Sequence, residues 1–260
     1  MDLYLTDKVF IVTGGAKGIG AAISKGIAAE GGIVVIAGRD ETDNQRTVDE
    51  ILQLKGKASS IKAELSEVAA CQAVIDFAIK NYGQIDGIVN NAGVNDSVGV
   101  EKGSPEKFMQ SIIKNLTHYY NLVHYALPHL KKTKGSIVNI GSKVATTGQG
   151  NTSGYAASKG AINALTREWA VEFLPFSIRV NTVLPAEVWT PLYENWINSL
   201  PDPKAKLAQI VSKIPLEQRF TTAEEIADMS VFLLSKRSAH TTGQLIFVDG
   251  GYTHLDRSLT

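Results

Sequence analysis

Three residues between positions 142 and 159 have the side-chain types needed to move a proton to or from an alcohol. Tyr155 and Lys159 are four residues apart, so on a helix their side chains share a face. Ser142 follows an apolar run at 137–140 that predicts a buried strand. A neighbouring ammonium favours the phenolate of a tyrosine. We therefore expect Tyr155 to act as a general acid/base, Lys159 to lower its pKa and Ser142 to hydrogen-bond the substrate oxygen.

The elements that must position these residues alternate along the chain. Apolar periodicity predicts strands at 8–12, 33–37, 58–62, 85–89, 137–140, 177–183 and 244–248, and helices at 21–30, 44–55, 67–81, 116–130, 156–173 and 223–235. This alternation predicts an α/β fold, a single Rossmann-like doubly wound parallel sheet of about seven strands with helices on both faces. Ligands of such sheets bind beyond the carboxyl ends of the strands, where Ser142 belongs. By itself, a Tyr–Lys pair four residues apart is also common on ordinary amphipathic helices.

Composition and charge exclude several classes of function. The chain has 260 residues, of which 26 are basic and 26 acidic, so no net field favours a nucleic acid or a membrane surface. Cys71 is the single cysteine, which excludes an intrachain disulfide and fits a reducing cytoplasm. Segment 1–7 lacks a signal-peptide pattern, and no apolar run approaches the roughly 18 residues of a membrane span. We expect one cytoplasmic domain over residues 1–260.

A glycine-rich loop, TGGAKGIG at 13–20, joins the first predicted strand to the first predicted helix. Gly14 suits a tight turn, Gly18 allows the backbone to approach a pyrophosphate, and Gly20 permits close packing. The N-terminus of the helix adds N–H donors and the positive end of its dipole. The loop therefore predicts a phosphate-binding site, although an ordinary glycine-rich turn would have the same composition.

Two basic residues indicate which dinucleotide binds. Arg39 follows the second predicted strand, where NADP enzymes place an arginine for the 2′-phosphate, and Lys17 adds a charge in the glycine loop. Both favour NADP over NAD. Asp40 leaves NAD open, because an acidic residue there can bind a ribose hydroxyl. The two cations could also be merely solvated.

The motifs taken together resemble the short-chain dehydrogenase/reductase family over residues 8–252. They are, in chain order, TGGAKGIG at 13–20, NNAG at 90–93, Asn115, Ser142 and YAASK at 155–159. The resemblance implies that Tyr155 is the acid/base, that Lys159 also holds the nicotinamide ribose, and that Asn115 holds a helix and the water of a proton relay. Ala186 and Glu64 depart from the usual family pattern, but neither removes a catalytic group.

The strand ends and the resemblance together indicate a cofactor-binding set. It comprises Gly14, Lys17, Gly18, Ile19, Gly20, Arg39, Glu64, Leu65, Asn91, Ala92, Gly93, Tyr155, Lys159, Pro185, Val188 and Thr190. The expected catalytic residues are Asn115, Ser142, Tyr155 and Lys159. We find no HExxH motif or Cys/His cluster among the five histidines, so we expect no metal site.

The residues expected near the substrate are unusually polar. Besides Ser142 and Tyr155, they are Asn95, Lys143, Gln149, Glu187 and Trp196. A ligand covered with hydroxyls needs many donors and acceptors, which favours a sugar or polyol. The segment 187–215 is rich in aromatic residues and predicts a substrate lid, with a self-packed surface loop as the alternative.

Longer strings, among them SKVATTGQGNTSGYAASKGA and PAEVWTPLYENWI, resemble the L-fucose dehydrogenase branch of the family. That resemblance implies oxidation of a pyranose anomeric hydroxyl to a lactone. A general carbonyl reductase acting on ketones or 3-oxoacyl groups is the alternative, and a non-catalytic cofactor-binding regulator belongs to another class. The family resemblance and the apolar faces of the helices at 116–130 and 156–173 also lead us to expect a homotetramer.

Overall fold

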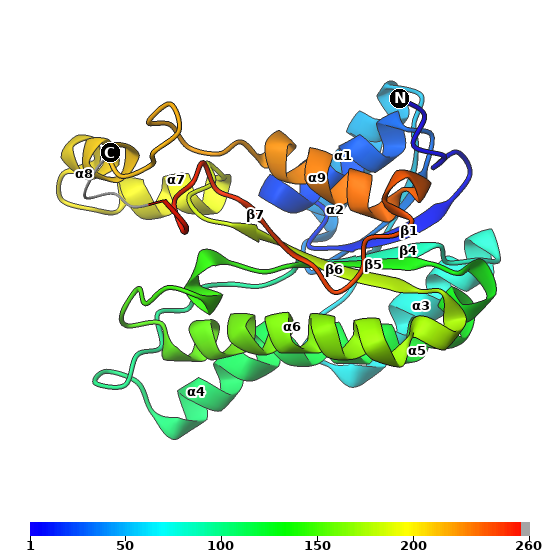
Figure 1. The fold of residues 1–260 in the computed structure, drawn as a ribbon, viewed down its shortest axis with the longest axis horizontal. Coiled ribbons are helices and arrows are strands. Elements are labelled where there is room, and N and C mark those ends of the chain that lie inside the picture. Colours follow the sequence, from blue (N-terminus) through cyan, green and yellow to red (C-terminus); the bar gives the residue numbers. More distant parts are fainter. Residues whose placement is uncertain (256–260) are drawn as a thin grey trace.

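A parallel sheet forms the centre of the computed structural model, which describes residues 1–255. Residues 256–260, the end of the expected domain, lie outside the described part. The strands are β1 (Val9–Thr13), β2 (Ile33–Gly38), β3 (Lys57–Lys62), β4 (Gly87–Asn90), β5 (Ser136–Ile140), β6 (Arg179–Pro185) and β7 (Leu245–Val248). They lie in the order β3-β2-β1-β4-β5-β6-β7, and every neighbouring pair is parallel (Figure 1). The predicted seven-stranded, doubly wound sheet is therefore confirmed.

The helices cover both faces of this sheet. They are α1 (Gly18–Ala29), α2 (Glu41–Gln53), α3 (Val68–Tyr82), α4 (Pro105–Ile112), α5 (His118–Thr133), α6 (Ser153–Glu172), α7 (Pro191–Asn198), α8 (Pro203–Val211) and α9 (Ala223–Leu234). Figure 1 shows α1, α2 and α9 on one face and α3, α4, α5 and α6 on the other. Because both faces are covered, the central strands are buried along their length rather than on alternate residues, as the fully buried β1 illustrates.

Each face has its own hydrophobic core. On the α3/α5/α6 side, Val74, Leu122 and Ile162 belong to one buried cluster. On the α1/α2/α9 side, Ile27 and Ile226 belong to a second cluster. These two cores hold the helices against the sheet and so fix the loops at the strand ends.

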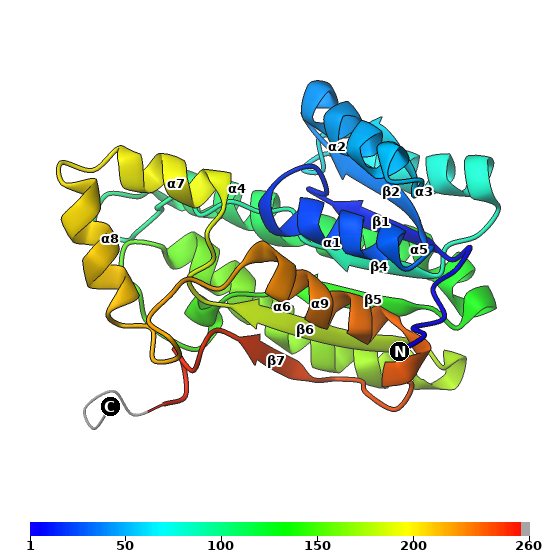
Figure 2. The ribbon, with the colours of Figure 1, turned by 90° about the horizontal axis from the view of Figure 1, so that it is seen from above.

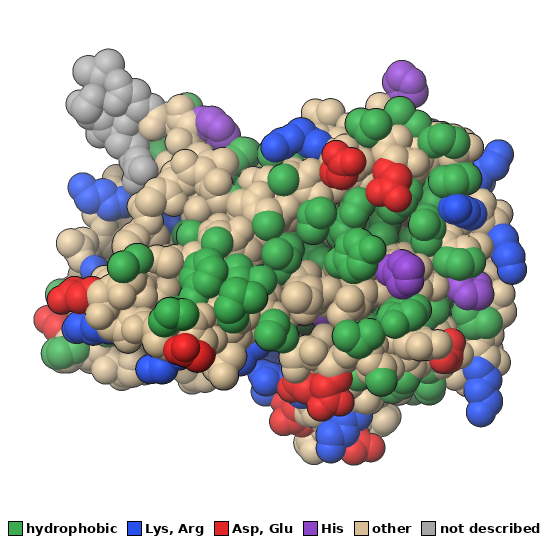
Figure 3. Space-filling model, turned by 90° about the horizontal axis from the view of Figure 1, so that it is seen from below, with side chains coloured by type: hydrophobic (Ala, Val, Ile, Leu, Met, Phe, Trp, Pro, Cys, Tyr) green, Lys and Arg blue, Asp and Glu red, His purple; other side chains and the backbone are tan. Residues whose placement is uncertain are grey.

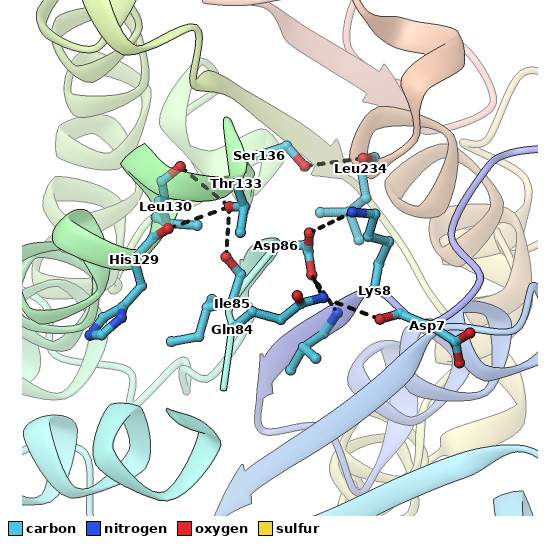
Figure 4. Close-up of polar contacts among 11 residues, drawn as sticks. Asp7, Lys8, Gln84, Ile85, Asp86, His129, Leu130, Thr133, Ser136 and Leu234 are labelled. Carbon is cyan, nitrogen blue, oxygen red and sulfur yellow. Dashed lines mark hydrogen bonds and ion pairs between the residues drawn. The ribbon is translucent and has the colours of Figure 1, made fainter. Parts of the chain in front are cut away.

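Polar contacts close the end of the sheet where the strands begin (Figure 4). The Asp86 carboxylate accepts hydrogen bonds from the Val9 backbone N–H and the Gln84 side chain, both at 2.8 Å, and lies 3.1 Å from the Lys8 ammonium. On the neighbouring strand, the Ser136 hydroxyl donates to the Leu234 carbonyl at 3.1 Å. The opposite end, where the strands finish, is left for ligands.

Several elements differ from those expected from the periodicity. The helix predicted at 116–130 begins earlier, as α4, and passes through a π-helical turn, Ile113–Thr117, before α5. Two further helices, α7 and α8, form the expected lid segment, and each begins with a proline at its first turn. Figure 2 shows α7 and α8 projecting past the end of the sheet. Among residues 1–255, no helix has the length and apolarity to cross a membrane.

Candidate active site

A cleft of about 440 Å³ opens at the carboxyl ends of the strands, on both sides of the point where the strand order reverses. Its walls come from the glycine loop and from the segments that follow β2, β3, β4, β5 and β6. All the expected cofactor residues line it except Gly20 and Val188. This is where open α/β sheets bind their ligands, and the volume lies within the usual range for ligand sites, roughly 300–1,000 Å³.

The glycine loop is shaped by close backbone approaches. Gly14 has a φ of +60°, which disfavours other residue types. A side chain at Gly20 would collide with the Gly14 carbonyl, so Gly20 lies behind the loop rather than in the cleft. The Asn91 side chain donates to the Thr13 carbonyl at 2.8 Å and to the Gly14 carbonyl at 3.2 Å, and so holds the loop against the end of β4.

The charged residues at the mouth of the cleft are partly engaged with one another. Lys17 forms an ion pair with Asp43, and the hydrogen bond from Lys17 is the largest cause of the lowered pKa of Asp43. One oxygen of Asp40 caps α2 by accepting from the Asp43 N–H at 3.0 Å. Arg39 lies 3.7 Å from Glu64, but its side chain is 74% exposed. Arg39 is therefore the more available of the two expected cations.

Two of the expected catalytic residues, Tyr155 and Lys159, line the cleft, and Ser142 lies beside Tyr155. Tyr155 and Lys159 lie on the first turns of α6 and both line the cleft. Ser142 follows β5, is 9% exposed and forms a hydrogen bond with Tyr155. The arrangement places a phenol, a hydroxyl and an ammonium side by side, as proton transfer to or from an alcohol requires.

The electrostatics differ from what spacing alone suggested. Burial raises the pKa of Tyr155, and the hydrogen bond with Ser142 only partly opposes this rise. Burial also lowers the pKa of Lys159 to about 7. The expected lowering of the Tyr155 pKa by Lys159 is therefore not found, because both groups are desolvated and the ammonium does not touch the phenol oxygen in the described structure.

Asn115 lies in the π-helical turn and is fully buried. Its side-chain oxygen accepts from the Val94 N–H at 2.7 Å, and its amide donates to the Ser111 carbonyl at 3.0 Å. Asn115 thus joins the segment after β4 to the helix run below it. The wider turn interrupts the regular helical hydrogen bonds, a feature common at functional sites.

His118 is a cleft residue that sequence reasoning missed. It follows the π-helical turn, is 1% exposed and lines the cleft together with Lys159. Its Nε2 lies 3.1 Å from the Lys114 carbonyl, whereas its Nδ1 has no hydrogen-bond partner among the described residues. In the sequence, its only signal is a histidine three residues after Asn115, without a motif that assigns it a role.

The substrate side of the site contains a buried ion pair. Lys143, directly after Ser142, pairs with Glu187, and their side chains are 10% and 13% exposed. The Tyr193 hydroxyl on α7 donates to the other Glu187 oxygen at 2.8 Å. The Lys143 ammonium also lies 4.0 Å from the centre of the Tyr252 ring. The segment from Glu187 to Tyr193 and the segment around Tyr252 are thereby joined to Lys143.

The other expected substrate residues lie further out. Trp196 on α7 is 45% exposed and packs edge-on against Tyr193, with ring centres 5.2 Å apart. Asn95 and Gln149 are exposed, and the Asn95 side chain accepts from the Ser97 N–H. None of the expected substrate residues except Tyr155 lines the 440 Å³ cleft. In residues 1–255, no cluster of three or more His, Cys, Asp or Glu side chains is placed to hold a metal ion.

The residues present fit a dinucleotide cofactor. The glycine cradle exists only because side chains are absent at Gly14 and Gly20, and it presents the N-terminus of α1 to phosphates. Further along the cleft, the Lys159 ammonium can donate to a ribose hydroxyl. At the outer end, the exposed Arg39 guanidinium can reach a phosphate.

The family assignment agrees with this geometry. A family model described as enoyl-(acyl carrier protein) reductase matches residues 14–253. The chain therefore belongs to the short-chain dehydrogenase/reductase family, and it is an NAD(P)-dependent oxidoreductase that acts on CH–OH groups.

Curated relatives include enzymes of different specificity. L-fucose dehydrogenase of Rattus norvegicus is 34% identical over 245 residues, which is 94% of this chain and 88% of the relative. A 3-oxoacyl-[acyl-carrier-protein] reductase of Thermotoga maritima is also 34% identical, over 250 residues that make up 96% of this chain and 99% of that protein.

Solved structures show the same fold over the whole chain. The crystal structure of Cj0485 dehydrogenase has a TM-score of 0.96 and 45% identity, covering 100% of this chain and 99% of that one. The ligand-free aldohexose dehydrogenase of Thermoplasma acidophilum has a TM-score of 0.89 and 31% identity, with 99% and 98% covered.

Proposed function

We propose that this protein oxidises an aldopyranose such as L-fucose at C1, with transfer of a hydride to NADP and formation of the lactone. The observation that carries the sugar assignment is the buried Lys143–Glu187 ion pair beside Ser142. An ammonium and a carboxylate there offer a donor and an acceptor to neighbouring hydroxyls of one ligand. An apolar substrate would gain nothing from such a pair, whose desolvation is costly.

Each remaining substrate residue has a part in this proposal. Ser142 and Tyr155 hold the reacting oxygen, while Asn95, Lys143, Gln149 and Glu187 bind the other hydroxyls. Trp196 covers an apolar edge such as the 6-methyl group of a deoxy sugar. The lid is the segment 187–215, in which α7 carries Trp196 and is joined to Glu187 through Tyr193. Closure of this segment would bring the outer residues toward the substrate.

The chemistry divides between the cofactor and the chain. When bound, NADP supplies the hydride acceptor. Tyr155 takes the proton of the C1 hydroxyl, and Ser142 hydrogen-bonds the same oxygen as its charge changes. Lys159 donates to the cofactor ribose. Asn115 fixes the helix run beneath the site through its bonds to Val94 and Ser111.

The availability of Arg39 and Asp40 at the mouth of the cleft favours NADP over NAD. Arg39 is exposed and lines the cleft, so its guanidinium can meet a 2′-phosphate. Asp40, which would favour NAD, already uses one oxygen to cap α2. NAD is the alternative cofactor if the second Asp40 oxygen binds the ribose.

A carbonyl reductase of ketones or 3-oxoacyl groups is the second candidate function. The specific observation in its favour is an aromatic cluster of Trp189, Tyr193, Trp196 and Phe220, which would suit an apolar substrate. The Thermotoga relative is named as such a reductase. A non-catalytic regulator has less support, because Ser142, Tyr155 and Lys159 are all present and adjacent.

The two functions are separated by steady-state kinetics with a substrate panel. We expect kcat/KM to be highest for L-fucose, lower for its 6-hydroxy analogue by the roughly 10–200-fold that a methyl contact provides, and lower again for D-glucose. A hydrophobic ketone with reduced cofactor tests the reductase. If that ketone is the best substrate, the sugar assignment is wrong.

A further inference from the structure

His118 is buried in the cleft wall, and the proposed function assigns it no role. It belongs to the helix run that contains Asn115, and it lines the cleft together with Lys159. Because Nε2 faces the Lys114 carbonyl at 3.1 Å, Nε2 carries the proton and donates. The remaining nitrogen, Nδ1, is then a bare acceptor. It is buried and lacks a partner among the described residues, so its partner must come from the cleft.

The groups around His118 keep it neutral. Burial is the largest cause of its pKa falling to about 4, and the charge of Lys159 on α6 lowers it further. Glu64, from the segment after β3, and the bond to the Lys114 carbonyl act in the opposite direction but do not prevail. The Tyr119 ring lies 4.8 Å away, centre to centre. At neutral pH, His118 is therefore a fixed acceptor rather than a cation.

Lys159 supplies the complementary group. Its ammonium donates to the Ile140 carbonyl at 2.7 Å and to the Tyr119 hydroxyl at 3.3 Å. An ammonium has three N–H donors, so one remains for a ligand in the cleft. A buried acceptor and an unused donor thus line the same cleft, and each lies beside the Tyr119 ring.

We infer that His118 Nδ1 and the Lys159 ammonium together bind one O–H group, whose oxygen accepts from Lys159 and whose hydrogen is donated to His118. A water molecule and a ribose hydroxyl of the bound cofactor have this same chemistry. The bound oxygen gives the desolvated ammonium a further partner and so holds Lys159 in its protonated form. His118 is thus a positioning residue that acts through Lys159. The site depends on the cofactor class alone and would stand if the sugar assignment failed.

Two substitutions distinguish the effect of the Nδ1 acceptor from the effect of the ring's volume. In His118→Asn, the amide oxygen takes the place of Nδ1 and keeps an acceptor. In His118→Phe, the ring volume is kept and the acceptor is lost. His240→Phe, at an exposed position outside the cleft, is the matched control. Thermal unfolding of all three variants shows whether each folds.

The readouts are the titration of the Lys159 side chain, followed by NMR in the ligand-free protein, and the dissociation constant of reduced cofactor, followed by fluorescence. If the O–H group is a water, His118→Phe shifts the ligand-free titration of Lys159 to lower pH by about one unit, a tenfold change. If it is a ribose hydroxyl, that titration is unchanged and the cofactor binds about tenfold more weakly. In both cases His118→Asn and His240→Phe behave as wild type.

Two results would overturn the inference. One is a folded His118→Phe protein in which neither the Lys159 titration nor cofactor affinity changes. The other is a His118→Asn protein that behaves like His118→Phe, because ring shape rather than the acceptor would then matter. Should His118→Phe not fold, the ¹⁵N shift of Nδ1 in the wild type decides. A hydrogen-bonded lone pair, with or without cofactor, supports the site, and a free lone pair in both states refutes it.

Discussion

Lys159 and Tyr155 share a helix face, yet the ammonium lies 5.5 Å from the centre of the Tyr155 ring and bonds to the Ile140 carbonyl instead. The Tyr155 hydroxyl is paired with Ser142. In the ligand-free protein the two residues therefore act separately. Tyr155 is a protonated phenol beside Ser142, and the Lys159 side chain points to the Ile140 carbonyl, which lines the cleft.

Replacing Tyr155 by phenylalanine should remove turnover while leaving the cofactor bound. The change deletes only the hydroxyl that carries the proton, so we expect kcat to fall by roughly 10²–10⁴-fold. The dissociation constant of the reduced cofactor, measured by fluorescence, should stay within about threefold of wild type. Activity near the wild-type level in Tyr155→Phe would show that another group carries the proton.

The raised pKa of Tyr155 predicts opposite pH profiles for the two directions of reaction. Oxidation needs the phenolate, and burial makes the phenolate scarce at neutral pH, so kcat for oxidation should rise with pH through the alkaline range. Reduction needs the phenol and should be fastest at neutral or lower pH. Initial rates in both directions from pH 6 to 10 test this, and an oxidation optimum at or below pH 7 contradicts it.

The Lys143–Glu187 pair predicts a particular order of stabilities. Glu187→Leu leaves the Lys143 charge buried without its partner and should lower the free energy of unfolding by about 3 kcal/mol. The double variant Lys143→Met/Glu187→Leu should lose less, because neither charge remains. Lys25→Met breaks an exposed pair with Glu50 and should cost less than about 1 kcal/mol.

Urea unfolding of these proteins measures the order directly. With the single variant Lys143→Met measured as well, a double variant as unstable as the sum of Lys143→Met and Glu187→Leu would mean that the two charges do not interact. In that case the ion pair would no longer support a polar substrate.

Much of the site followed from local sequence, because strand ends and helix spacing are local properties. The glycine loop, Arg39 and Tyr155 could be placed once β1, β2 and α6 were predicted, and those elements are present. The Lys143–Glu187 contact could not be predicted, since it joins residues 44 positions apart through the packing of β5 beside β6. The role of His118 could not be predicted, because its Nδ1 lacks a partner among the described residues through burial rather than through any motif.

Arg39 should set the choice of cofactor. Loss of a charge-assisted bond to a 2′-phosphate costs about 1.5–3 kcal/mol, so Arg39→Ala should raise KM for NADP tenfold or more and leave KM for NAD nearly unchanged. Lys62→Ala is the control, because Lys62 is exposed, lies close in sequence to Glu64 and does not line the cleft. A wild-type protein with a higher kcat/KM for NAD would show that Asp40 prevails.

The helix face below the sheet predicts self-association. Figure 3 views this face and shows hydrophobic side chains gathered across it. Tyr120 on α5 is 54% exposed, Val171 on α6 is 67% exposed, and Leu174 beyond α6 is 59% exposed. Exposed apolar patches of this kind mark interaction surfaces, and homo-oligomers close by symmetry. We expect a tetramer built partly from this face.

Light scattering at micromolar concentration tests the assembly. Val171→Glu should reduce the mass of the wild-type particle by half or more, whereas Leu54→Glu, at an exposed site near the end of α2, should leave it unchanged. A monomeric wild-type protein contradicts the prediction.

The most direct test of the proposed function is the structure of the product. Purified protein is incubated with L-fucose labelled with ¹³C at C1 and an excess of NADP, with NAD in a parallel sample, and the product is identified by NMR. We predict loss of the anomeric C1 signal and a lactone carbonyl signal in its place, with one reduced cofactor formed per sugar. An unchanged sugar, with a hydrophobic ketone reduced by the same preparation, would contradict it.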